Sequence, residues 1–338
     1  LRVASEFHPD AILSEQTDVA VPNVAYVAER LGLPGIGYDV ALRATDKWLM
    51  RESCRIDGIP TPEYRLVTSA EDAIVAARQI GFPAVVKPAD NQSSRGVTKV
   101  SEIAAVPAAA EAALAASQSG RVLVEECMVG QESSVESFVI GDVVHVLGIC
   151  EKIKCAPPYS FDLQLIYPAA FPREVMQEIE EFNRSVIRTI GIKMGFAHAE
   201  VMITNGGVRL IEIAARGCGG RVATDLLPEL TGVDLLELRL RQALGEQVQM
   251  PEIRSDRVGI LRFFELPSGT VRRVGGLREA AAVPGVVHVE FTPAVGAHLK
   301  PPVSGDQRPG FMLSVANSRY QAITIADKVT NLIAVDVV

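Results

Sequence analysis

Apolar and polar positions follow two rhythms along this chain, and together they predict a protein of helices and strands. Residues 21–31 repeat their apolar side chains at the spacing of an amphipathic helix, whereas residues 208–213 alternate as a half-buried strand does. The same criteria predict helices at 45–57, 70–81, 107–117, 173–191 and 234–244. They predict strands at 11–14, 84–87, 98–100, 122–125, 133–140, 143–149 and 196–203. Helices interleaved with strands in this order are typical of an α/β protein.

Further expectations concern the boundaries of these elements. Thr45 is a suitable cap for the helix at 45–57. Residues 152–171, rich in proline and aromatic side chains, are expected to be irregular, and the residues after Pro251 alternate like a final β-rich subdomain. The first residues start inside a predicted helix, so we expect that the N-terminal part of a βαβ unit is missing.

The most informative segment is a predicted hairpin that carries two glutamates. An Asn-Gly-Gly turn joins the strands at 196–203 and 208–213, and antiparallel pairing would bring Glu200 and Glu212 to one end of a sheet, with Arg216 following. Two carboxylates beside a guanidinium suit a Mg²⁺–nucleotide, because hard cations prefer oxygen ligands and arginine binds phosphoryl groups. A surface hairpin with ordinary charges explains this segment equally well when it is taken alone.

Length and charge narrow the class of protein. The chain has 338 residues, 48% apolar and 22% charged, so we expect a globular protein with two or three lobes. Its net charge of −8 at pH 7 argues against a nucleic acid as the main partner, although a local basic pocket can still bind a nucleotide. The five cysteines form no CxxC pair, and we find no secretory leader and no long apolar run. We therefore expect a cytoplasmic protein with no membrane partner.

Polar residues follow the first apolar strand of the central region. Lys87 ends the strand at 84–87, and a small polar loop, residues 90–97, comes next. Such a loop can fold over phosphates with its backbone N–H groups and hydroxyls, and Arg95 adds positive charge. A plain hairpin loop is the alternative interpretation.

A second group of polar residues surrounds the end of the strand at 122–125. Glu125 and Glu126 lie there, and the chain continues through Gly130 to Glu132. A strand-to-linker hinge of this kind can read an adenine ring with backbone N–H and C=O groups, while Glu132 holds ribose hydroxyls. Acidic pairs at strand ends are also common without a ligand.

Taken in order, six segments resemble the successive motifs of the ATP-grasp superfamily: TDKWLMRE, FPAVVKP, NQSSRGV, VEECMVGQE, AHAEVMI and RLIEIAAR. The resemblance covers roughly residues 37–245 and is nearest to the amino-acid ligase branch. It implies an ATP-grasp fold of the α/β class with α+β lobes. The implied parts are the end of a truncated N-terminal α/β domain (1–44), a linker helix with the small lobe (45–126), the large lobe (127–250) and a β-rich C-terminal subdomain (251–338).

The resemblance also implies a nucleotide site and its residues. The matching positions are Lys47, Lys87, Ser93, Ser94, Gly96, Glu125, Glu126, Met128 and Glu132. The two lysines would contact the phosphates of ATP, and the serines and the glycine would close over them. The backbone of Glu126 and Met128 would meet the adenine, and Glu132 would bind the ribose.

For the chemical step, the resemblance implies a metal ion and several cationic side chains. Glu200 and Glu212 would hold Mg²⁺, or Mn²⁺ in its place, and Arg216 would stabilise the transferring phosphoryl group. Arg221 is a candidate for holding a substrate carboxylate, and Lys152 is a candidate for reaching phosphate or substrate, with Lys154 as its alternative. Residues 156–171 either line the substrate, through Tyr159, Phe161 and Asp162, or form a connection stiffened by prolines.

One position departs from the family pattern. The superfamily usually has Glu-x-Asn-x-Arg on the last strand, whereas Ala214 occupies the asparagine position here. Alanine cannot ligate a metal, so either fewer protein groups and water hold the ion, or another residue substitutes, or activity is lost. His198, close to Glu200 in sequence, is expected to face away from it and to be a packed histidine.

Three functions remain open. The first, which we favour, is a ligase that activates a small carboxylate as an acylphosphate with ATP and joins it to an amine in a dipeptide-like amide. The second keeps that chemistry but acts on bicarbonate, formate or a nucleotide intermediate, as ATP-grasp carboxylases and purine-pathway enzymes do. The third is a nucleotide-binding protein that has lost catalysis. The resemblance alone implies a homodimer.

Overall fold

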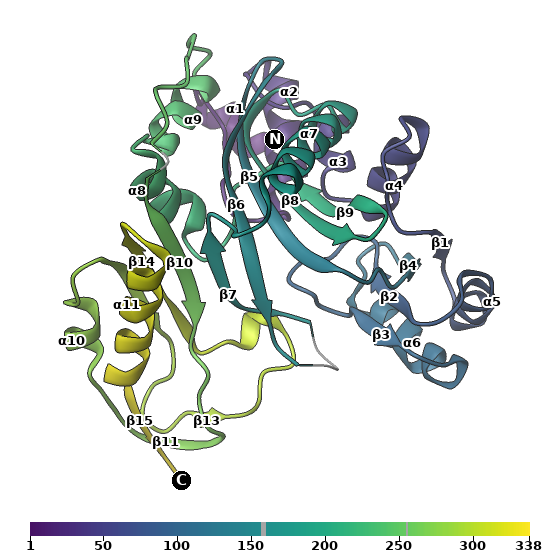
Figure 1. The fold of residues 1–338 in the computed structure, drawn as a ribbon. Helices are drawn as coiled ribbons and strands as arrows, with labels where there is room; N and C mark the ends of the chain where they lie inside the picture. Colours follow the sequence, from purple (N-terminus) through teal and green to yellow (C-terminus); the bar gives the residue numbers. More distant parts are fainter. Residues whose placement is uncertain (157–159, 255) are drawn as a thin grey trace. The chain divides into compact units, whose positions relative to one another are not determined.

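Two compact units make up the structure, a computed structural model that describes residues 1–156, 160–254 and 256–338. The first unit comprises Leu1–Leu147, Phe171–Gly217 and Leu236–Met250, and the second comprises Gly148–Ala170, Cys218–Leu235 and Pro251–Val338. Figure 1 follows the chain through both. Each unit has a hydrophobic core of its own.

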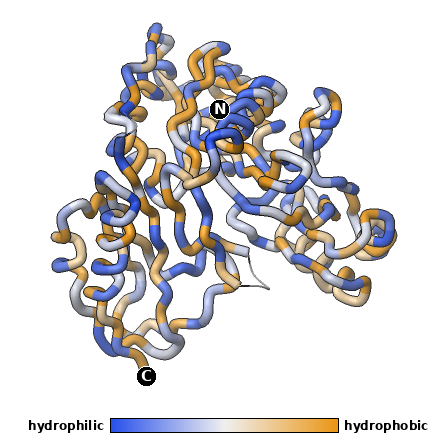
Figure 2. Tube along the Cα trace, in the orientation of Figure 1, coloured by the Kyte–Doolittle hydropathy of each residue, from blue (hydrophilic) through white to orange (hydrophobic). Residues whose placement is uncertain are grey.

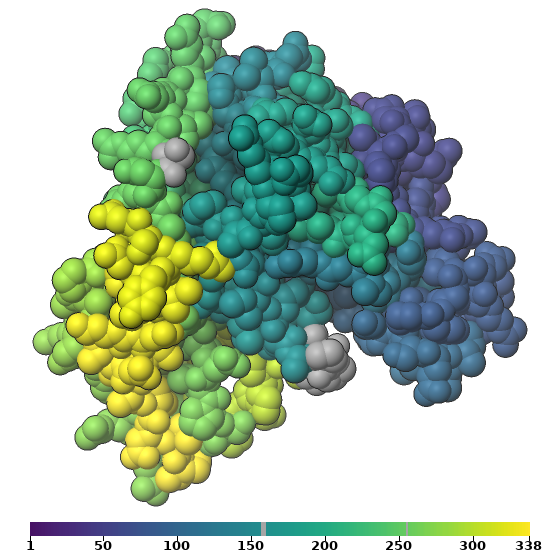
Figure 3. All heavy atoms as spheres, viewed as in Figure 1, coloured from purple at the N-terminus to yellow at the C-terminus, as the bar shows by residue number. Residues whose placement is uncertain are grey.

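A small antiparallel sheet with two helices forms one lobe of the first unit. Its strands stand in the order β1-β4-β2-β3. They are β1 (Tyr64–Val67), β2 (Ala84–Pro88), β3 (Thr98–Val100) and β4 (Val122–Glu126). The helices α5 (Ala70–Ile80) and α6 (Val106–Ala116) pack on it through fully buried alanines such as Ala77 and Ala110. The lobe is the blue body at the right of Figures 1 and 3.

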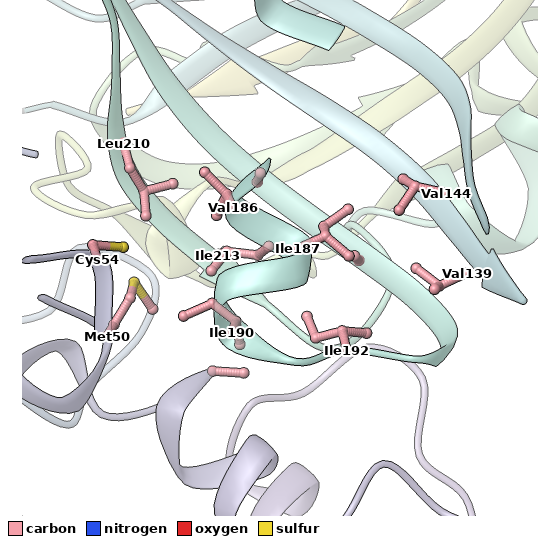
Figure 4. Packing of buried hydrophobic residues seen from close by; sticks show 13 residues of the cluster. Met50, Cys54, Val139, Val144, Val186, Ile187, Ile190, Ile192, Leu210 and Ile213 are labelled. Atoms are coloured by element: carbon pink, nitrogen blue, oxygen red, sulfur yellow. The ribbon is translucent and has the colours of Figure 1, made fainter. Parts of the chain in front are cut away.

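Three long antiparallel strands, in the order β5-β8-β9, are the part of the larger sheet that lies wholly in this unit. They are β5 (Gln131–Ile140), β8 (Met194–Thr204) and β9 (Gly207–Ala214). The long helix α7 (Arg173–Ile190) packs against the sheet, and its Ile187 and Ile190 lie in one buried cluster with Leu210 and Ile213 of β9 (Figure 4). This core holds β8 and β9 in a fixed register.

Helix α4 (Lys47–Ile56) shares that core, and this packing decides where its polar side chains point. Met50 and Cys54, one turn apart, lie in the same cluster as Ile190 (Figure 4). Lys47 and Arg51, which lie on the adjacent side of this helix, are also buried. Apolar packing on one side therefore anchors two cations on the adjacent side.

The cap of α4 differs from the prediction by one residue. Asp46 is the N-cap, and its Oδ1 accepts hydrogen bonds from the backbone N–H groups of Trp48 and Leu49 at 2.9 and 3.1 Å. Thr45 instead donates its hydroxyl to the carbonyl of Ala41 at 2.8 Å. Aspartate is at least as good a cap as threonine, and its charge also favours the helix N-terminus.

The other helices of the first unit are α1 (Arg2–Phe7), α2 (Ala20–Leu31), α3 (Tyr38–Arg43) and α9 (Leu235–Ala243). Hydrophobic residues recur along helices and strands throughout the chain, as Figure 2 shows. Within the described ranges, no helix is both long enough and apolar enough to cross a membrane.

The second unit is built on an antiparallel sheet with the strand order β12-β14-β10-β7 and a smaller sheet with the order β13-β11-β15. The chain enters this unit within β6 (Val143–Lys154), which pairs with β7. The remaining strands are β7 (Asp162–Tyr167), β10 (Val258–Phe263), β11 (Gly269–Gly275), β12 (Val286–Phe291), β13 (His298–Leu299), β14 (Gly310–Ala316) and β15 (Ala334–Val337). The α-helices are α8 (Leu227–Thr231), α10 (Leu277–Ala281) and α11 (Arg319–Leu332), and two short helical segments are the π-helix η2 (Val222–Leu226) and the 3-10 helix η3 (Gly305–Gln307).

Two predictions of local structure were wrong. Residues 11–14 belong to no strand among those the structure describes. Residues 152–171 are not irregular throughout, because β6 continues to Lys154 and β7 follows. Tyr159 lies outside the described residues. The prolines in this region led us to predict irregular structure. Residues 162–167 form a strand because β6 and β10 pair with them on both sides.

Candidate active site

Glu200 of β8 and Glu212 of β9 are direct cross-strand partners, which confirms the predicted hairpin. The register shifts immediately after this pair, between Glu200 and Val201. A bulge of this kind re-aims side chains and is often found next to functional sites. The side chains are 20% and 30% exposed, so both carboxylates remain accessible from solvent while anchored in the sheet.

The neighbouring row of the same sheet contains Glu136 of β5, His198 of β8 and Ala214 of β9. The expectation that His198 faces away from Glu200 was wrong, because residues two apart on a strand share a face. His198 Nδ1 lies 2.8 Å from Glu136 Oε1, and its Nε2 lies 3.7 Å from Glu200 Oε1. The imidazole therefore stands between two carboxylates.

Lys47, at the first turn of α4, reaches the acidic pair. Its Nζ lies 3.1 Å from Glu212 Oε2 and donates a hydrogen bond to the carbonyl of Asn91 at 2.7 Å. Burial alone would lower the pKa of Lys47, but Glu212 and Asp18 outweigh it and the pKa is raised. Lys47 thus stays protonated and joins Glu212 of β9 to the loop that follows Lys87.

Lys87 lies in a buried cluster with one carboxylate and a second cation. Its Nζ is 2.6 Å from Glu125 Oε2, and Arg51 donates to the same carboxylate at 2.9 and 3.3 Å. Burial, helped by Arg51 and Lys47 and opposed by Glu125, lowers the pKa of Lys87 to about 8. The pKa of Glu125 is lowered because the two cations outweigh its burial. The cluster has an excess of positive charge that an anion would offset.

The loop after Lys87 has a strained backbone. Ser93, Ser94 and Gly96 have positive φ angles of 59°, 58° and 70°, and both serines are exposed. Successive residues in unusual conformations can turn backbone N–H groups toward a shared anion. A Cβ on Gly96 would lie only 2.7 Å from the Cβ of Ala116, so the loop requires glycine there.

Arg216, just after β9, is held by a residue from the N-terminal segment. Its Nε and Nη2 donate to Asp18 Oδ1 and Oδ2 at 2.6 and 2.9 Å. The backbone N–H of Asp18 donates to Gln92 Oε1 at 3.0 Å, within the loop that carries the serines. Asp18 therefore links Arg216 to the loop, and its charge, together with that of Glu212, raises the pKa of Lys47.

The hinge after β4 is tied to the larger sheet. Arg209 of β9 donates to both oxygens of Glu126, at 3.0 and 2.7 Å. The N–H of Glu126 donates to the carbonyl of Glu63 at 2.8 Å, so backbone recognition of an adenine at this residue would use its carbonyl oxygen. Met128 and Glu132 follow in the hinge and at the start of β5, and both are half-buried.

Two predicted site residues belong to the second unit. Lys152 of β6 is buried, with its Nζ 3.5 Å from Asp162 Oδ2 of β7, and Lys154 Nζ lies 3.9 Å from Asp162 Oδ1. Arg221 has a positive φ of 59° and forms an ion pair with Asp225, including an Nη2–Oδ1 contact of 3.2 Å. Their roles remain predictions.

Sequence reasoning missed two residues that organise the first unit's site, Arg51 and Asp18. Arg51 stands one helical turn after Lys47 in the motif TDKWLMRE, and that spacing places both on one helix face. It joins Glu125 to the carbonyl of Ile211 on β9, at 2.7 Å for the latter. Asp18 carried no local signal, because its partner Arg216 is 198 positions away.

The carboxylate pair suits a divalent cation by its chemistry. Two partly exposed carboxylates stand side by side, and the positive charge beside Glu212 is the ammonium group of Lys47. Oxygen ligands of this kind fit Mg²⁺ or Mn²⁺. Ala214, in the adjacent row, offers no ligand atom.

These features, a small antiparallel lobe with a lysine and a polar loop beside a larger sheet with an acidic pair, define the ATP-grasp class of fold. An ATP-grasp domain family model matches residues 80–225, and the model of the L-amino acid ligase C-terminal domain 2 matches residues 262–338. The D-alanine–D-alanine ligase of Paracidovorax citrulli (strain AAC00-1) is 30% identical over 247 residues, which cover 68% of this chain and 72% of that protein. The chain belongs to the ATP-grasp superfamily, in its carboxylate–amine ligase branch.

Two other similarities concern an uncharacterised relative and the fold. The uncharacterised protein y4rH of Sinorhizobium fredii (strain NBRC 101917 / NGR234) is 28% identical over 309 residues, and the match covers 90% of this chain but only 64% of that relative. The crystal structure of an L-amino acid ligase from Bacillus licheniformis superimposes with a TM-score of 0.87 at 24% identity, over 100% of this chain and 83% of that one. The predicted fold class is confirmed.

Proposed function

We propose that the protein is an ATP-dependent ligase that joins a small carboxylate to an amine. The observation that carries this proposal is the cross-strand pair of Glu200 and Glu212, with Lys47 beside it and Arg216 on the chain that leaves β9. This set supplies oxygen ligands for a cation and positive charge for a phosphoryl group in one place. The amino-acid ligases among the relatives favour amino acids as substrates.

In this proposal Lys47 and Lys87 bind the phosphates of ATP, and Ser93, Ser94 and Gly96 close over them. The excess positive charge around Lys87 supports its role, because burial and the cations Arg51 and Lys47 lower its pKa, and a bound triphosphate would offset the positive charge. Glu125 would position Lys87 rather than touch the nucleotide, since it is buried and already bonded to two cations.

The hinge would bind the nucleoside. The carbonyl of Glu126 and the backbone of Met128 would meet the adenine, and Glu132 would bind the ribose hydroxyls. The ion pair between Glu126 and Arg209 supports this arrangement because it fixes the hinge against β9. A rigid hinge loses little entropy on binding a planar base.

Glu200 and Glu212 would hold Mg²⁺ or Mn²⁺, which when bound neutralises charge on the phosphates. An oxygen of the substrate carboxylate attacks the γ-phosphorus, the bond to ADP breaks, and an acylphosphate forms. Arg216 offsets the charge that develops on the transferring group. The amine then attacks the acyl carbon and loses a proton, and phosphate leaves. One oxygen of this phosphate comes from the original carboxylate.

Two residues of the second unit, Arg221 and Lys152, also have proposed roles. Arg221 is proposed to hold a substrate carboxylate and Lys152 to reach phosphate or substrate. The division into 1–44, 45–126, 127–250 and 251–338 and the homodimer are part of the same proposal and rest on the family alone. The cytoplasmic location is proposed from the cysteine content and the hydropathy of the sequence.

Phosphate and ADP release test the proposal directly. The protein is incubated with Mg²⁺–ATP and amino acids, singly and in pairs, and release that requires a particular pair is the expected result. Glu212→Gln should abolish phosphate release without unfolding the protein. Glu111→Gln, at an exposed site on α6, is the control and should leave phosphate release unchanged. Release that continues in Glu212→Gln would overturn the metal assignment.

A further inference from the structure

Ala214 cannot ligate a metal, but a side chain that can do so lies opposite it on the neighbouring strand. His198 of β8 is the cross-strand partner of Ala214 on β9, and the adjacent row contains Glu200 and Glu212. Alternate residues on a strand share a face, so His198, Glu200 and Glu212 lie on the same face of the sheet as Ala214. An imidazole thus stands beside the acidic pair, on the strand next to the position where the family places an amide.

The second nitrogen of His198 is held by a buried carboxylate. Nδ1 lies 2.8 Å from Oε1 of Glu136, the cross-strand neighbour on β5, whose side chain is only 2% exposed. An ionised carboxylate can only accept a hydrogen bond, so this contact assigns the proton to Nδ1. In the neutral ring, Nε2 then presents its lone pair, which is the arrangement of histidine ligands with a carboxylate behind them.

Nε2 is directed toward the carboxylate that the proposed function gives to the metal. It lies 3.7 Å from Glu200 Oε1, which is too long for a hydrogen bond. Two ligands of one octahedral cation with bonds of about 2.1 Å stand about 3 Å apart when adjacent and about 4.2 Å apart when opposite. A lone pair and a carboxylate at this separation can therefore share a cation with little movement.

We propose that His198 supplies, through Nε2, the metal ligand that Ala214 cannot, and that Glu136 positions it. The inference rests on the proposed function, because it concerns the cation held by Glu200 and Glu212. The site would consist of two carboxylates and one imidazole. Because imidazole nitrogen suits transition metals better than Mg²⁺, such a site prefers Mn²⁺ more strongly than an all-oxygen site does.

Pulsed electron paramagnetic resonance of bound Mn²⁺ tests the proposal without turnover. The protein is loaded with Mn²⁺ and the β,γ-methylene analogue of ATP, whose bridge contains no nitrogen. The expected result is ¹⁴N modulation from a coordinated imidazole in the wild type and its loss in His198→Gln. We also expect Mn²⁺ affinity to fall about 10–100-fold in that variant.

Two further variants separate a ligand from a structural histidine. Ala214→Asn restores an amide oxygen on the neighbouring strand of the same row, so the Mn²⁺ affinity of Ala214→Asn/His198→Gln should recover most of the loss. Glu136→Gln should weaken Mn²⁺ binding but keep the ¹⁴N signal, because the ring is still present. Circular dichroism confirms that each variant is folded.

Each outcome has a distinct meaning. Mn²⁺ bound with the nucleotide analogue but without imidazole modulation would overturn the role of His198 and leave the ligase proposal intact. An unchanged Mn²⁺ affinity in His198→Gln would overturn it as well. Failure of the wild type to bind Mn²⁺ with the analogue would overturn the proposed function itself.

Discussion

Asp18 and Arg216, 198 positions apart in the sequence, form a two-pronged ion pair. The side chains are 19% and 12% exposed, so water screens this pair less than it screens a surface salt bridge. A third hydrogen bond, from Nη1 to the carbonyl of Gly217 at 2.9 Å, fixes the plane of the guanidinium. Arg216 is therefore oriented by the protein before any phosphoryl group arrives, which is the preorganisation that electrostatic catalysis requires.

Asp18→Asn should reduce kcat about 10–100-fold, as loss of a positioning partner commonly does, with a much smaller effect on the KM for ATP. Asparagine keeps the size of the side chain but cannot accept two charge-assisted hydrogen bonds. Steady-state kinetics measure both constants, and Asp57→Asn, at an exposed aspartate, is the matched control. In an Arg216→Lys background the substitution should add little, and additive losses would contradict the coupling.

Nucleotide binding should draw a proton onto Lys87. Its pKa is lowered to about 8 by burial and by the nearby cations Arg51 and Lys47. A bound triphosphate raises this pKa, so affinity for ATP should fall as pH rises through 8, by up to about tenfold per pH unit. Calorimetry in buffers of different ionisation enthalpy measures the proton uptake. Lys87→Met should abolish it, whereas Lys99→Met, an exposed lysine on β3, should leave it unchanged.

Glu15 should make the stability of the fold depend on pH. Burial raises its pKa from 4.5 to about 7, although Arg239 Nε lies 3.2 Å from Oε1 and opposes the shift. The folded state then binds a proton that the unfolded chain has lost, so the free energy of unfolding falls by about 3 kcal/mol as pH rises from about 4.5 to about 7. Denaturant unfolding at several pH values should show a flatter profile for Glu15→Gln. Identical slopes would refute the assignment.

Gly96 and Gly120 offer a comparison within one lobe. Both have positive φ, 70° and 67°, but a Cβ at Gly96 would meet Ala116 at 2.7 Å whereas one at Gly120 meets nothing within 4 Å. Gly120→Ala should cost about 1 kcal/mol through backbone strain alone, and Gly96→Ala about 2–3 kcal/mol. Only Gly96→Ala should also weaken ATP binding, because it moves the loop at residues 90–97 that is proposed to close over the phosphates. Equal effects on ATP affinity would contradict a role for this loop.

Local pairings were predictable from the sequence, and distant ones were not. The cross-strand pair of Glu200 and Glu212 follows from a tight turn and a period of two, because both fix the register over a few residues. The pairs of Asp18 with Arg216 and of Arg51 with Glu125 depend on how whole elements pack, and no local pattern encodes that. Motif order predicts that Lys47 and Lys87 share a site although they lie on different elements, and Lys47 is near enough to contribute to the lowered pKa of Lys87.

The errors have physical causes as well. β7 was missed because its neighbours on both sides supply the hydrogen bonds that make it a strand. The orientation of His198 was predicted wrongly because His198 and Glu200 were treated as adjacent residues, which face opposite ways, whereas they are two apart and share a face. The cap at Thr45 was off by one, since threonine and aspartate compete for the same role at adjacent positions.

Isotope transfer tests the central claim, the acylphosphate, most directly. A substrate carboxylate labelled with ¹⁸O is incubated with ATP and the amine, and the released phosphate is analysed by mass spectrometry. The account predicts one ¹⁸O in each phosphate formed, in step with ADP and amide. Phosphate without the label, or AMP and pyrophosphate in place of ADP, would contradict it.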